Sequence, residues 1–153
     1  MRAVIQRVLH TDVKIDGAEY SAIDKGLLIL LGIKVGDTKA DAEYVASKCM
    51  GLRIFEDENG KLNLSSGDIG GEFMVVSNFT LYGDTSHGKR PSFIDAERPE
   101  KAEPLYEYFT DLIKNSGFSV KTGKFGADMK INILNDGPIT IIIDSETAKQ
   151  KEK

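Results

Sequence analysis

An unbroken apolar run, Gly26-Leu27-Leu28-Ile29-Leu30-Leu31-Gly32, constrains the fold more than any other part of the sequence. Its length is that of a strand, and a strand that is apolar at successive positions has to be covered on both faces. The run is far too short to cross a bilayer as a helix, which takes about 20 residues. We therefore expect a buried strand within a covered sheet and no membrane association.

The length and composition of the chain fit a single domain. Its 153 residues can form one real core, and 41% hydrophobic with 29% charged residues is close to the soluble globular average. No repeat or Pro- or Ser-rich linker divides the sequence. We predict one mixed α/β domain over residues 1–145, richer in sheet than in helix, followed by a frayed polar tail at residues 146–153.

The first of two main helices is predicted for residues 38–52. Thr38 precedes Asp41 at the spacing of a capping box, and apolar residues then recur at helical spacing. Cys49 lies on the apolar stripe of this pattern. We therefore expect Cys49 to be buried in the core.

The second helix is predicted to begin between Pro99 and Pro104 and to end before Gly117, because proline favours the first turn and glycine follows the last. Turn-forming pairs at Asp16-Gly17 and Asn59-Gly60 predict two hairpins. The other expected strands cover residues 1–9, 13–15, 20–23, 53–56, 61–64, 72–79, 119–122, 129–134 and 139–144.

The charge and the single cysteine restrict partners and location. A net charge of −4 and a pI near 5.2 argue against a broad basic face for nucleic acid, although a local basic patch fits this balance. Cys49 has no partner for an internal disulfide, and the opening MRAVIQRV lacks the apolar region of a signal peptide. We expect a cytoplasmic protein.

Metal chemistry and histidine-based catalysis are both disfavoured. Zinc and similar ions need about four ligands at short spacings, and the chain offers only His10, His87 and Cys49, which are widely separated. A Ser-His-Asp or Cys-His site needs a histidine base, but His87 lies in a polar loop. We predict neither a metal site nor a bound cofactor.

Residues 83–89, GDTSHGK, match the glycine and lysine positions of a phosphate-binding loop and follow a predicted strand. However, Arg90 occupies the position of the Mg²⁺-binding hydroxyl, and residues 89–98 lack the periodicity of the required helix. A nucleotide hydrolase is therefore a minor alternative. The favoured interpretation is a basic loop in which Lys89 and Arg90 can contact a phosphate.

Five segments, none of them specific by itself, together resemble the D-aminoacyl-tRNA deacylase family over about residues 1–144. They are AVIQRV at residues 3–8, SNFTL at 77–81, KRPSF at 89–93, FGADM at 125–129 and NDGPIT at 135–140. One departure is Asn78, because the family usually has a longer glutamine there. The amide of Asn78 is one methylene shorter than that of glutamine and reaches less far, whereas the neighbouring main-chain N-H groups do not depend on it.

The resemblance implies an enzyme that hydrolyses the aminoacyl ester on the terminal adenosine of D-aminoacyl-tRNA. The implied catalytic segment is Ser77, Asn78, Phe79 and Thr80, in which the main-chain N-H groups of Phe79 and Thr80 bind the oxyanion. The 2'-OH of the RNA would help to activate water. The alternative that uses no catalysis is a nucleic-acid-binding module.

The resemblance also implies a homodimer with its active sites at the subunit interface. Gly137 and Pro138 would be joined by a cis peptide bond and would place carbonyl groups in the active site of the other subunit, excluding L side chains. Arg7 would hold this pair, and Phe125 and Met129 would line the adenosine pocket. Such a site excludes L side chains but does not recognise the D side chain. The resemblance therefore implies that the enzyme accepts many D-amino acids and also acts on glycyl-tRNA(Ala).

Overall fold

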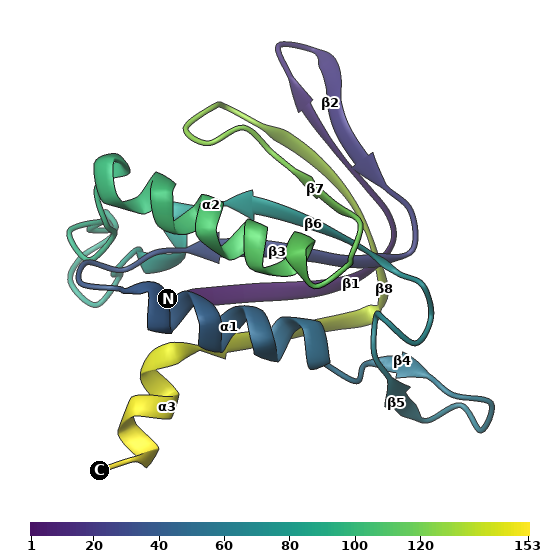
Figure 1. Cartoon of the computed structure of the whole chain (residues 1–153). Coiled ribbons are helices and arrows are strands. Elements are labelled where there is room, and N and C mark those ends of the chain that lie inside the picture. The colour runs from purple at the N-terminus through teal and green to yellow at the C-terminus, as the bar shows by residue number, and fades with distance from the viewer.

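The computed structural model describes residues 1–153 as a six-stranded mixed sheet with helices on one side and a separate two-stranded hairpin (Figure 1). This confirms the predicted mixed α/β class. The elements in chain order are β1 (Arg2–Ile15), β2 (Ala18–Ile23), β3 (Gly26–Gly32), α1 (Lys39–Gly51), β4 (Phe55–Glu56), β5 (Leu62–Leu64), β6 (Glu72–Ser77), the 3-10 helix η1 (Phe79–Tyr82), α2 (Pro99–Asn115), β7 (Val120–Thr122), β8 (Lys130–Asp144) and α3 (Ser145–Lys151).

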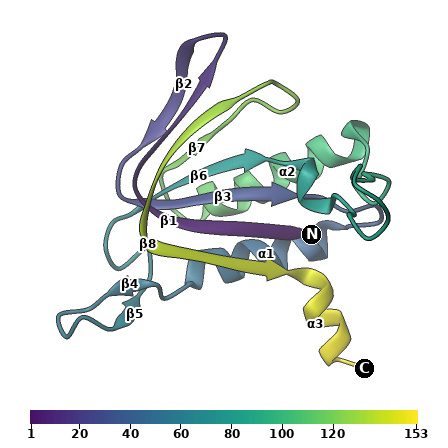
Figure 2. The same ribbon diagram turned by 180° about the vertical axis from the view of Figure 1, so that it is seen from behind.

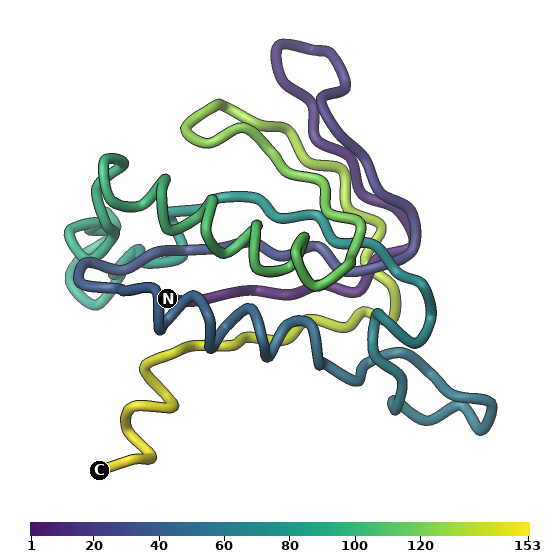
Figure 3. Tube along the Cα trace, in the orientation of Figure 1, coloured from purple at the N-terminus to yellow at the C-terminus, as the bar shows by residue number.

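The long strand β1 organises the sheet. Its first half pairs antiparallel with β3 and its second half with β2, while β8 pairs antiparallel with both halves. The strands β3, β6 and β7 are parallel neighbours. The trace in Figure 3 shows that the β1–β2 hairpin and the β7–β8 segment both curve away from the flat part of the sheet. The sheet is therefore strongly curled.

The apolar run at Gly26–Gly32 forms β3 and is covered on both faces, as predicted. Leu27, Ile29 and Leu31 belong to the larger core, which lies between the sheet and the helices. Leu28 alternates with them and belongs to a second core, together with Val13 of the curled part of β1. Because side chains alternate along a strand, two different layers bury the two faces of β3.

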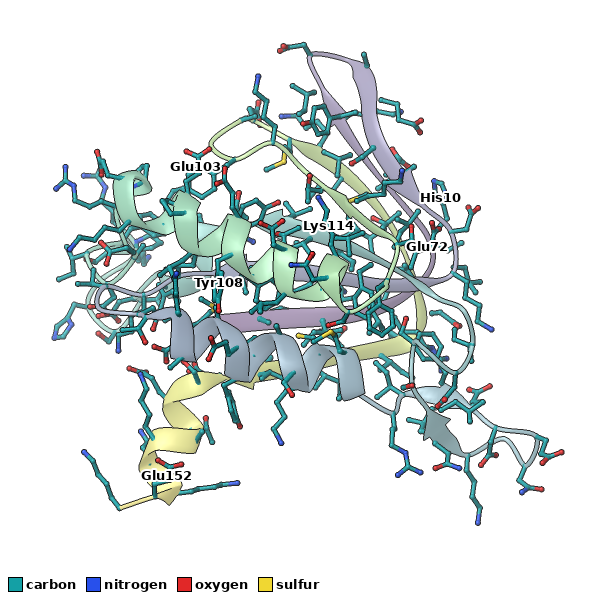
Figure 4. All side chains as sticks on the ribbon, viewed as in Figure 1. His10, Glu72, Glu103, Tyr108, Lys114 and Glu152 are labelled. Atoms are coloured by element: carbon teal, nitrogen blue, oxygen red, sulfur yellow. The ribbon has the colours of Figure 1, made fainter.

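Helices α1 and α2 lie side by side on one face of the sheet, and the view from behind shows the strands in front of them (Figures 1 and 2). The predicted capping box is present, since Thr38 and Asp41 bond reciprocally at the start of α1. Cys49 is fully buried, as expected. Tyr108 of α2 lies between the helices (Figure 4) and donates a hydrogen bond to Glu43 of α1.

The second helix begins at Pro99, within the predicted interval, and includes Pro104. The hairpin turns at Asp16-Gly17 and Asn59-Gly60 are present, with Asp16, Gly17 and Gly60 all at positive φ. The local turn and capping signals of the sequence therefore located these elements correctly.

No helix in the structure is both long enough and apolar enough to span a membrane.

The structure corrects four predictions. The two strands expected at residues 1–9 and 13–15 form the single strand β1. Residues 130–144 form the single strand β8 instead of two strands joined by a turn, and the pairing register with β1 shifts opposite residues 135–140. The strand β6 ends at Ser77, so Phe79 begins η1 instead of ending the strand. The expected frayed tail forms α3, which begins after Asp144, whose side chain accepts a hydrogen bond from the N-H of Glu146.

Candidate active site

A cavity of about 750 Å³ opens at the carboxyl ends of β3 and β6. In sheets with parallel strands this edge is a common position for ligand sites, because the connecting segments leave a crevice there. Twelve of the twenty lining residues are hydrophobic, so the cavity suits a largely apolar group such as a base or ring. The lining comes from the end of β3, from β6 with η1, from the start of α2 with the segment before it, and from the start of β8 with the segment before it.

The segment after β6 forms one wall. The N-H of Asn78 donates to the carbonyl of Leu31 at 2.8 Å, which continues the pairing of β6 with β3 by one residue. Gly32 then allows η1 to lie close against the end of β3, since a Cβ atom on Gly32 would be 3.0 Å from the Cβ of Leu81. As a result, Phe79 and Thr80 are exposed at the cavity.

The main-chain N-H groups of Phe79 and Thr80 are the first two of η1. The first N-H groups of a helix lack an acceptor within that helix, and the hydrogen bond from Leu81 to the carbonyl of Asn78 follows them. Both residues line the cavity, as do Ser77 and Asn78. Two main-chain N-H groups without an acceptor inside η1 therefore belong to residues that line the cavity.

The shorter side chain of Asn78 has a local partner. Its Oδ1 atom accepts a hydrogen bond from the hydroxyl group of Thr80, two residues away. The amide is therefore engaged within the segment that carries the N-H donors. Asn78 therefore has a structural role that does not require the longer side chain of glutamine.

Residues 125–129 form another part of the lining. The rings of Phe125 and Tyr106 have centroids 5.8 Å apart, and the Tyr106 hydroxyl donates to the carbonyl of Val75 at 2.8 Å. Burial raises the pKa of that hydroxyl, so it stays a neutral donor. Met129 lies over Gly123, where a Cβ atom would be only 2.6 Å from its Sδ atom. Phe125 and Met129 thus line the cavity, as the resemblance implies.

The rim includes residues to which the sequence analysis gave no role. Phe93 and Arg98 line the cavity from the segment before α2, and the rings of Phe79 and Phe93 meet edge to face with centroids 5.3 Å apart. Phe93 lies within the KRPSF segment. The resemblance of that segment to the family was the only signal in the sequence that pointed to Phe93.

Arg7, Gly137 and Pro138 do not line this cavity. Arg7 is opposite Leu27 at the start of β3, whereas the cavity borders Leu31. Four residues of strand separate these positions by roughly 13 Å. The Gly137–Pro138 peptide bond is cis, as the resemblance implies, and both residues are exposed. Within one chain the structure therefore gives two separate groups of predicted site residues.

The second group is held by a buried arginine. The Nη1 atom of Arg7 donates to the carbonyl of Ile54 at 3.0 Å, and its Nε atom lies 3.2 Å from Oδ2 of Asp136, close enough for an ion pair but without hydrogen-bond geometry. Asn135 donates from Nδ2 to the carbonyls of Arg7 and Ile139, each at 3.0 Å. Asn135 is a positioning residue that the sequence analysis did not identify.

The loop at residues 83–89 is not a phosphate-binding loop of the nucleotide-hydrolase type. Asp84 and Ser92 pair through two main-chain hydrogen bonds of 2.8 and 2.9 Å, and no helix begins between Lys89 and Pro99. Such a loop requires a helix directly after its lysine. This finding removes the nucleotide-hydrolase alternative. No group of three or more His, Cys, Asp or Glu side chains is arranged to hold a metal ion.

Known proteins match the chain over most of its length. The family described as D-Tyr-tRNA(Tyr) deacylase matches residues 4–144. A D-aminoacyl-tRNA deacylase of Desulfatibacillum aliphaticivorans is 53% identical, with 95% of this chain and 100% of that protein covered. One of Thermotoga petrophila is 52% identical, with 95% of this chain and 97% of that protein covered.

Solved structures share the fold. The c-Myc DNA Unwinding Element Binding Protein has a TM-score of 0.90 at 40% identity, with 95% of this chain and 99% of that chain covered. A probable eukaryotic D-amino acid tRNA deacylase has a TM-score of 0.82 at 14% identity, with coverage of 94% and 98%, and supports the fold alone. The match over residues 4–144 and the identity with relatives of full length establish that the chain belongs to the D-Tyr-tRNA(Tyr) deacylase family.

Proposed function

We propose that this chain is a D-aminoacyl-tRNA deacylase, which hydrolyses the ester between a D-amino acid and the terminal adenosine of tRNA. The observation that carries this proposal is the cavity lined by residues 77–80 and 125–129, two of the segments that resemble the family. Relatives that are 52–53% identical over nearly their whole length carry the same activity in their names. The products are a free D-amino acid and tRNA.

In the proposed reaction, the oxygen of water forms a bond to the ester carbonyl carbon, and the carbonyl oxygen becomes an oxyanion. The N-H groups of Phe79 and Thr80 bind this oxyanion. When the intermediate collapses, the bond to the ribose oxygen breaks and that oxygen takes a proton. No histidine lines the cavity, which fits a role for the RNA 2'-OH in activating water. The protein contributes mainly by positioning the ester.

The cavity also supports the proposed binding of the terminal adenosine. Phe125 and Met129 provide apolar surface in the lining of the cavity, and an adenine base can pack against such side chains. Phe79 and Thr80, whose N-H groups are the proposed oxyanion donors, belong to the same lining. We assign Phe125 and Met129 to the adenosine and residues 77–80 to the ester.

The filter for chirality is proposed to act between two copies of the chain. Gly137 and Pro138 are exposed and lie apart from the cavity of their own chain, so they can meet a substrate only in the cavity of a second copy. The strand β8 that carries them pairs only with β1 and exposes Ile142 and Leu134, with 65% and 56% of their surfaces accessible. An apolar, unpaired strand edge is suited to pairing with another copy.

Steric exclusion of an L side chain leaves D side chains unrestricted, so the enzyme should accept many D-amino acids. Glycine has no side chain to exclude, and glycyl-tRNA(Ala) should therefore also be hydrolysed. Arg7 acts here as a positioning residue, since it contacts Asp136, which directly precedes the pair.

Parallel incubation with D-tyrosyl-tRNA and L-tyrosyl-tRNA tests the function. The enzyme should release only the D-amino acid. A nucleic-acid-binding module without catalysis, which the name of the similar c-Myc DNA Unwinding Element Binding Protein keeps under consideration, should leave both esters intact. Sedimentation analysis should show a dimer, and a fully active monomer would contradict the filter between subunits.

A variant of the filter separates chirality from catalysis. Gly137 has a φ of +128°, and a Cβ atom there would be 2.7 Å from Cγ1 and 2.8 Å from the N atom of Ile139. Gly137→Ala should therefore displace the pair, so that L-tyrosyl-tRNA begins to be cleaved. Gly60→Ala is the control, because Gly60 also has a positive φ but lies in the β4–β5 hairpin with no atom near its Cβ position.

A further inference from the structure

We infer that Phe79 and Phe93 form a stacking surface for the base of the nucleotide that precedes the terminal adenosine, and that Lys89 and Arg90 bind the RNA backbone beside it. The inference rests on the proposed function, which places the terminal adenosine inside the cavity. It concerns the part of the single-stranded RNA end that remains outside the cavity.

The rim carries an unusual amount of exposed apolar surface. Phe79 is 58% exposed, Phe93 is 40% exposed, and the neighbouring Ile94 is 83% exposed. A single exposed apolar side chain needs no explanation, but aromatic rings in contact with each other at the mouth of a cavity mark a binding surface. The two rings touch edge to face, which leaves ring surface accessible to a third planar group.

The surface is fixed before any ligand binds. Phe79 is part of η1, and Phe93 directly follows the main-chain pairing of Asp84 with Ser92. Gly83 makes room for the Phe93 ring, since a Cβ atom on Gly83 would be 3.0 Å from its Cε1 atom. A preformed surface loses little conformational entropy when a ligand binds.

The loop beside the rings is locally positive, although the chain has a net charge of −4. Between Asp84 and Ser92 the charged side chains are Lys89 and Arg90, and both are exposed. The one carboxylate of the loop, on Asp84, accepts a hydrogen bond from the N-H of Ser86. Cationic side chains next to aromatic rings complement the alternation of phosphates and bases in a single-stranded RNA.

The geometry favours an RNA end over a second protein chain at this rim. A protein interface of apolar residues tends to exclude lysine, whereas an RNA backbone attracts it. The rim is continuous with the cavity, which is lined by both Phe79 and Phe93. A nucleotide chain that leaves the cavity on the side of Phe79 and Phe93 passes over these rings.

Binding of an RNA hairpin with an unacylated CCA end tests the inference without any need for catalysis. Fluorescence anisotropy is measured for this RNA and for the same RNA with an abasic site in place of the penultimate base. Base–aromatic stacking of about 1–3 kcal/mol corresponds to a change of roughly 5- to 150-fold in affinity. The wild-type protein should therefore bind the abasic RNA about tenfold more weakly.

Phe93→Ala should bind the intact RNA as weakly as the wild type binds the abasic RNA, and it should no longer distinguish the two RNAs. Leu62→Ala is the matched control, because Leu62 is 51% exposed on β5 and should change neither affinity. The double variant Lys89→Ala with Arg90→Ala should weaken binding of both RNAs and reduce the dependence of affinity on salt.

Hydrolysis of D-tyrosyl-adenosine, which has no second nucleotide, separates this inference from the proposed function. The Leu62→Ala control should hydrolyse it at the wild-type rate. If the wild type failed to hydrolyse D-tyrosyl-adenosine, the proposed function would be rejected. The difference in affinity between the intact and the abasic RNA would still show whether Phe79 and Phe93 stack on the penultimate base. The inference is overturned if the abasic site has no effect on the wild type, if Phe93→Ala keeps the full abasic effect, or if Phe93→Ala dissociates a protein dimer and leaves RNA affinity unchanged.

Discussion

The Nη1 atom of Arg2 donates a 2.9 Å hydrogen bond to the main-chain carbonyl of Leu81, 79 residues further along the chain. The Nε atom of the same guanidinium group bonds to Oδ2 of Asp144 at 2.9 Å, and the group lies 4.8 Å from the centroid of the Tyr82 ring. Arg2 thus connects the end of β8 with η1, which carries the proposed oxyanion donors.

Replacement of Arg2 should lower the rate of hydrolysis more than it raises KM. In Arg2→Ala, η1 loses its contact with β8, so the N-H groups of Phe79 and Thr80 should be less well positioned. We expect kcat to fall about tenfold, comparable to the loss of one hydrogen bond to a charged group. The measurement is steady-state hydrolysis of D-tyrosyl-tRNA. The exposed Lys14 on the same strand gives the control Lys14→Ala, and equal activity of the two variants would contradict the role of Arg2.

The hydroxyl of Thr80 should be dispensable for catalysis, since the proposed role of the residue uses its main-chain N-H. Thr80→Ala removes only the bond to the side chain of Asn78. Activity should stay within a few-fold of wild type, against the loss of about 10²–10³ that follows removal of an oxyanion donor. If a folded Thr80→Ala protein lost all activity, a covalent threonine mechanism would replace the proposed one.

Gly26→Ala should strongly destabilise the fold. A Cβ atom on Gly26 would lie 1.9 Å from the carbonyl oxygen of Glu72, so the start of β3 could not approach β6. We expect a loss of about 3 kcal/mol in the free energy of unfolding, measured by urea denaturation. Gly51→Ala is the control, because a Cβ atom on Gly51 would meet no other atom at the end of α1. The free energy of unfolding of this variant should rise by about 0.5–1 kcal/mol. Similar midpoints for the two variants would refute this account of β3.

Asp41 should make the protein sensitive to acid. Burial alone would raise its pKa, but hydrogen bonds from Lys149, Ser145 and the N-H of Thr38 together lower the pKa below its usual range. The unfolded chain then binds the proton more readily than the folded chain. This contribution to stability is complete above the ordinary pKa, about 3.9, and is lost as the pH falls toward the lower folded-state value.

The free energy of unfolding should therefore fall more steeply below pH 4 in the wild type than in Asp41→Asn. At neutral pH the substitution itself should cost about 1–3 kcal/mol, because it removes a charged partner from Lys149. Asp111→Asn, at an exposed position on α2, serves as the control and should keep the wild-type slope. An unchanged slope in Asp41→Asn would show that other carboxylates determine the acid sensitivity.

Chelation should leave hydrolysis of D-tyrosyl-tRNA unchanged, because the proposed mechanism relies on main-chain donors and the RNA hydroxyl. Dialysis against EDTA followed by an activity assay provides the measurement. Activity that disappears with EDTA and returns with Zn²⁺ or Mg²⁺ would require a different mechanism.

Elements with a local cause were predictable from the sequence. The strand β3 follows from its apolar run, and α1 follows from the capping box at Thr38 and Asp41. The long strand β8 was not predictable in this way, because residues 135–138 have the composition of a turn. Pairing with β1 on both sides of these residues keeps them within the strand, and that pairing is not visible in local sequence.

The same distinction applies to the candidate site. Residues 77–80 and 125–129 were identified through resemblance, and the structure brings them to one cavity. The contributions of Phe93 and Arg98 depend on how the segment before α2 crosses the end of the sheet, which no local pattern indicates. The helix α3 depends likewise on a distant contact, since Lys149 lies 2.7 Å from the buried Asp41.

The pairing of β1 with β8 also has a consequence for the order of folding during synthesis. The two strands join residues as distant as Arg2 and Asp144, so one edge of the central strand has no partner until nearly the whole domain has left the ribosome. Contacts between residues so far apart form slowly, and an unpaired strand edge is prone to association. A nascent chain that stalls before residue 130 should therefore need a chaperone, whereas the finished domain supplies its own cover for that edge.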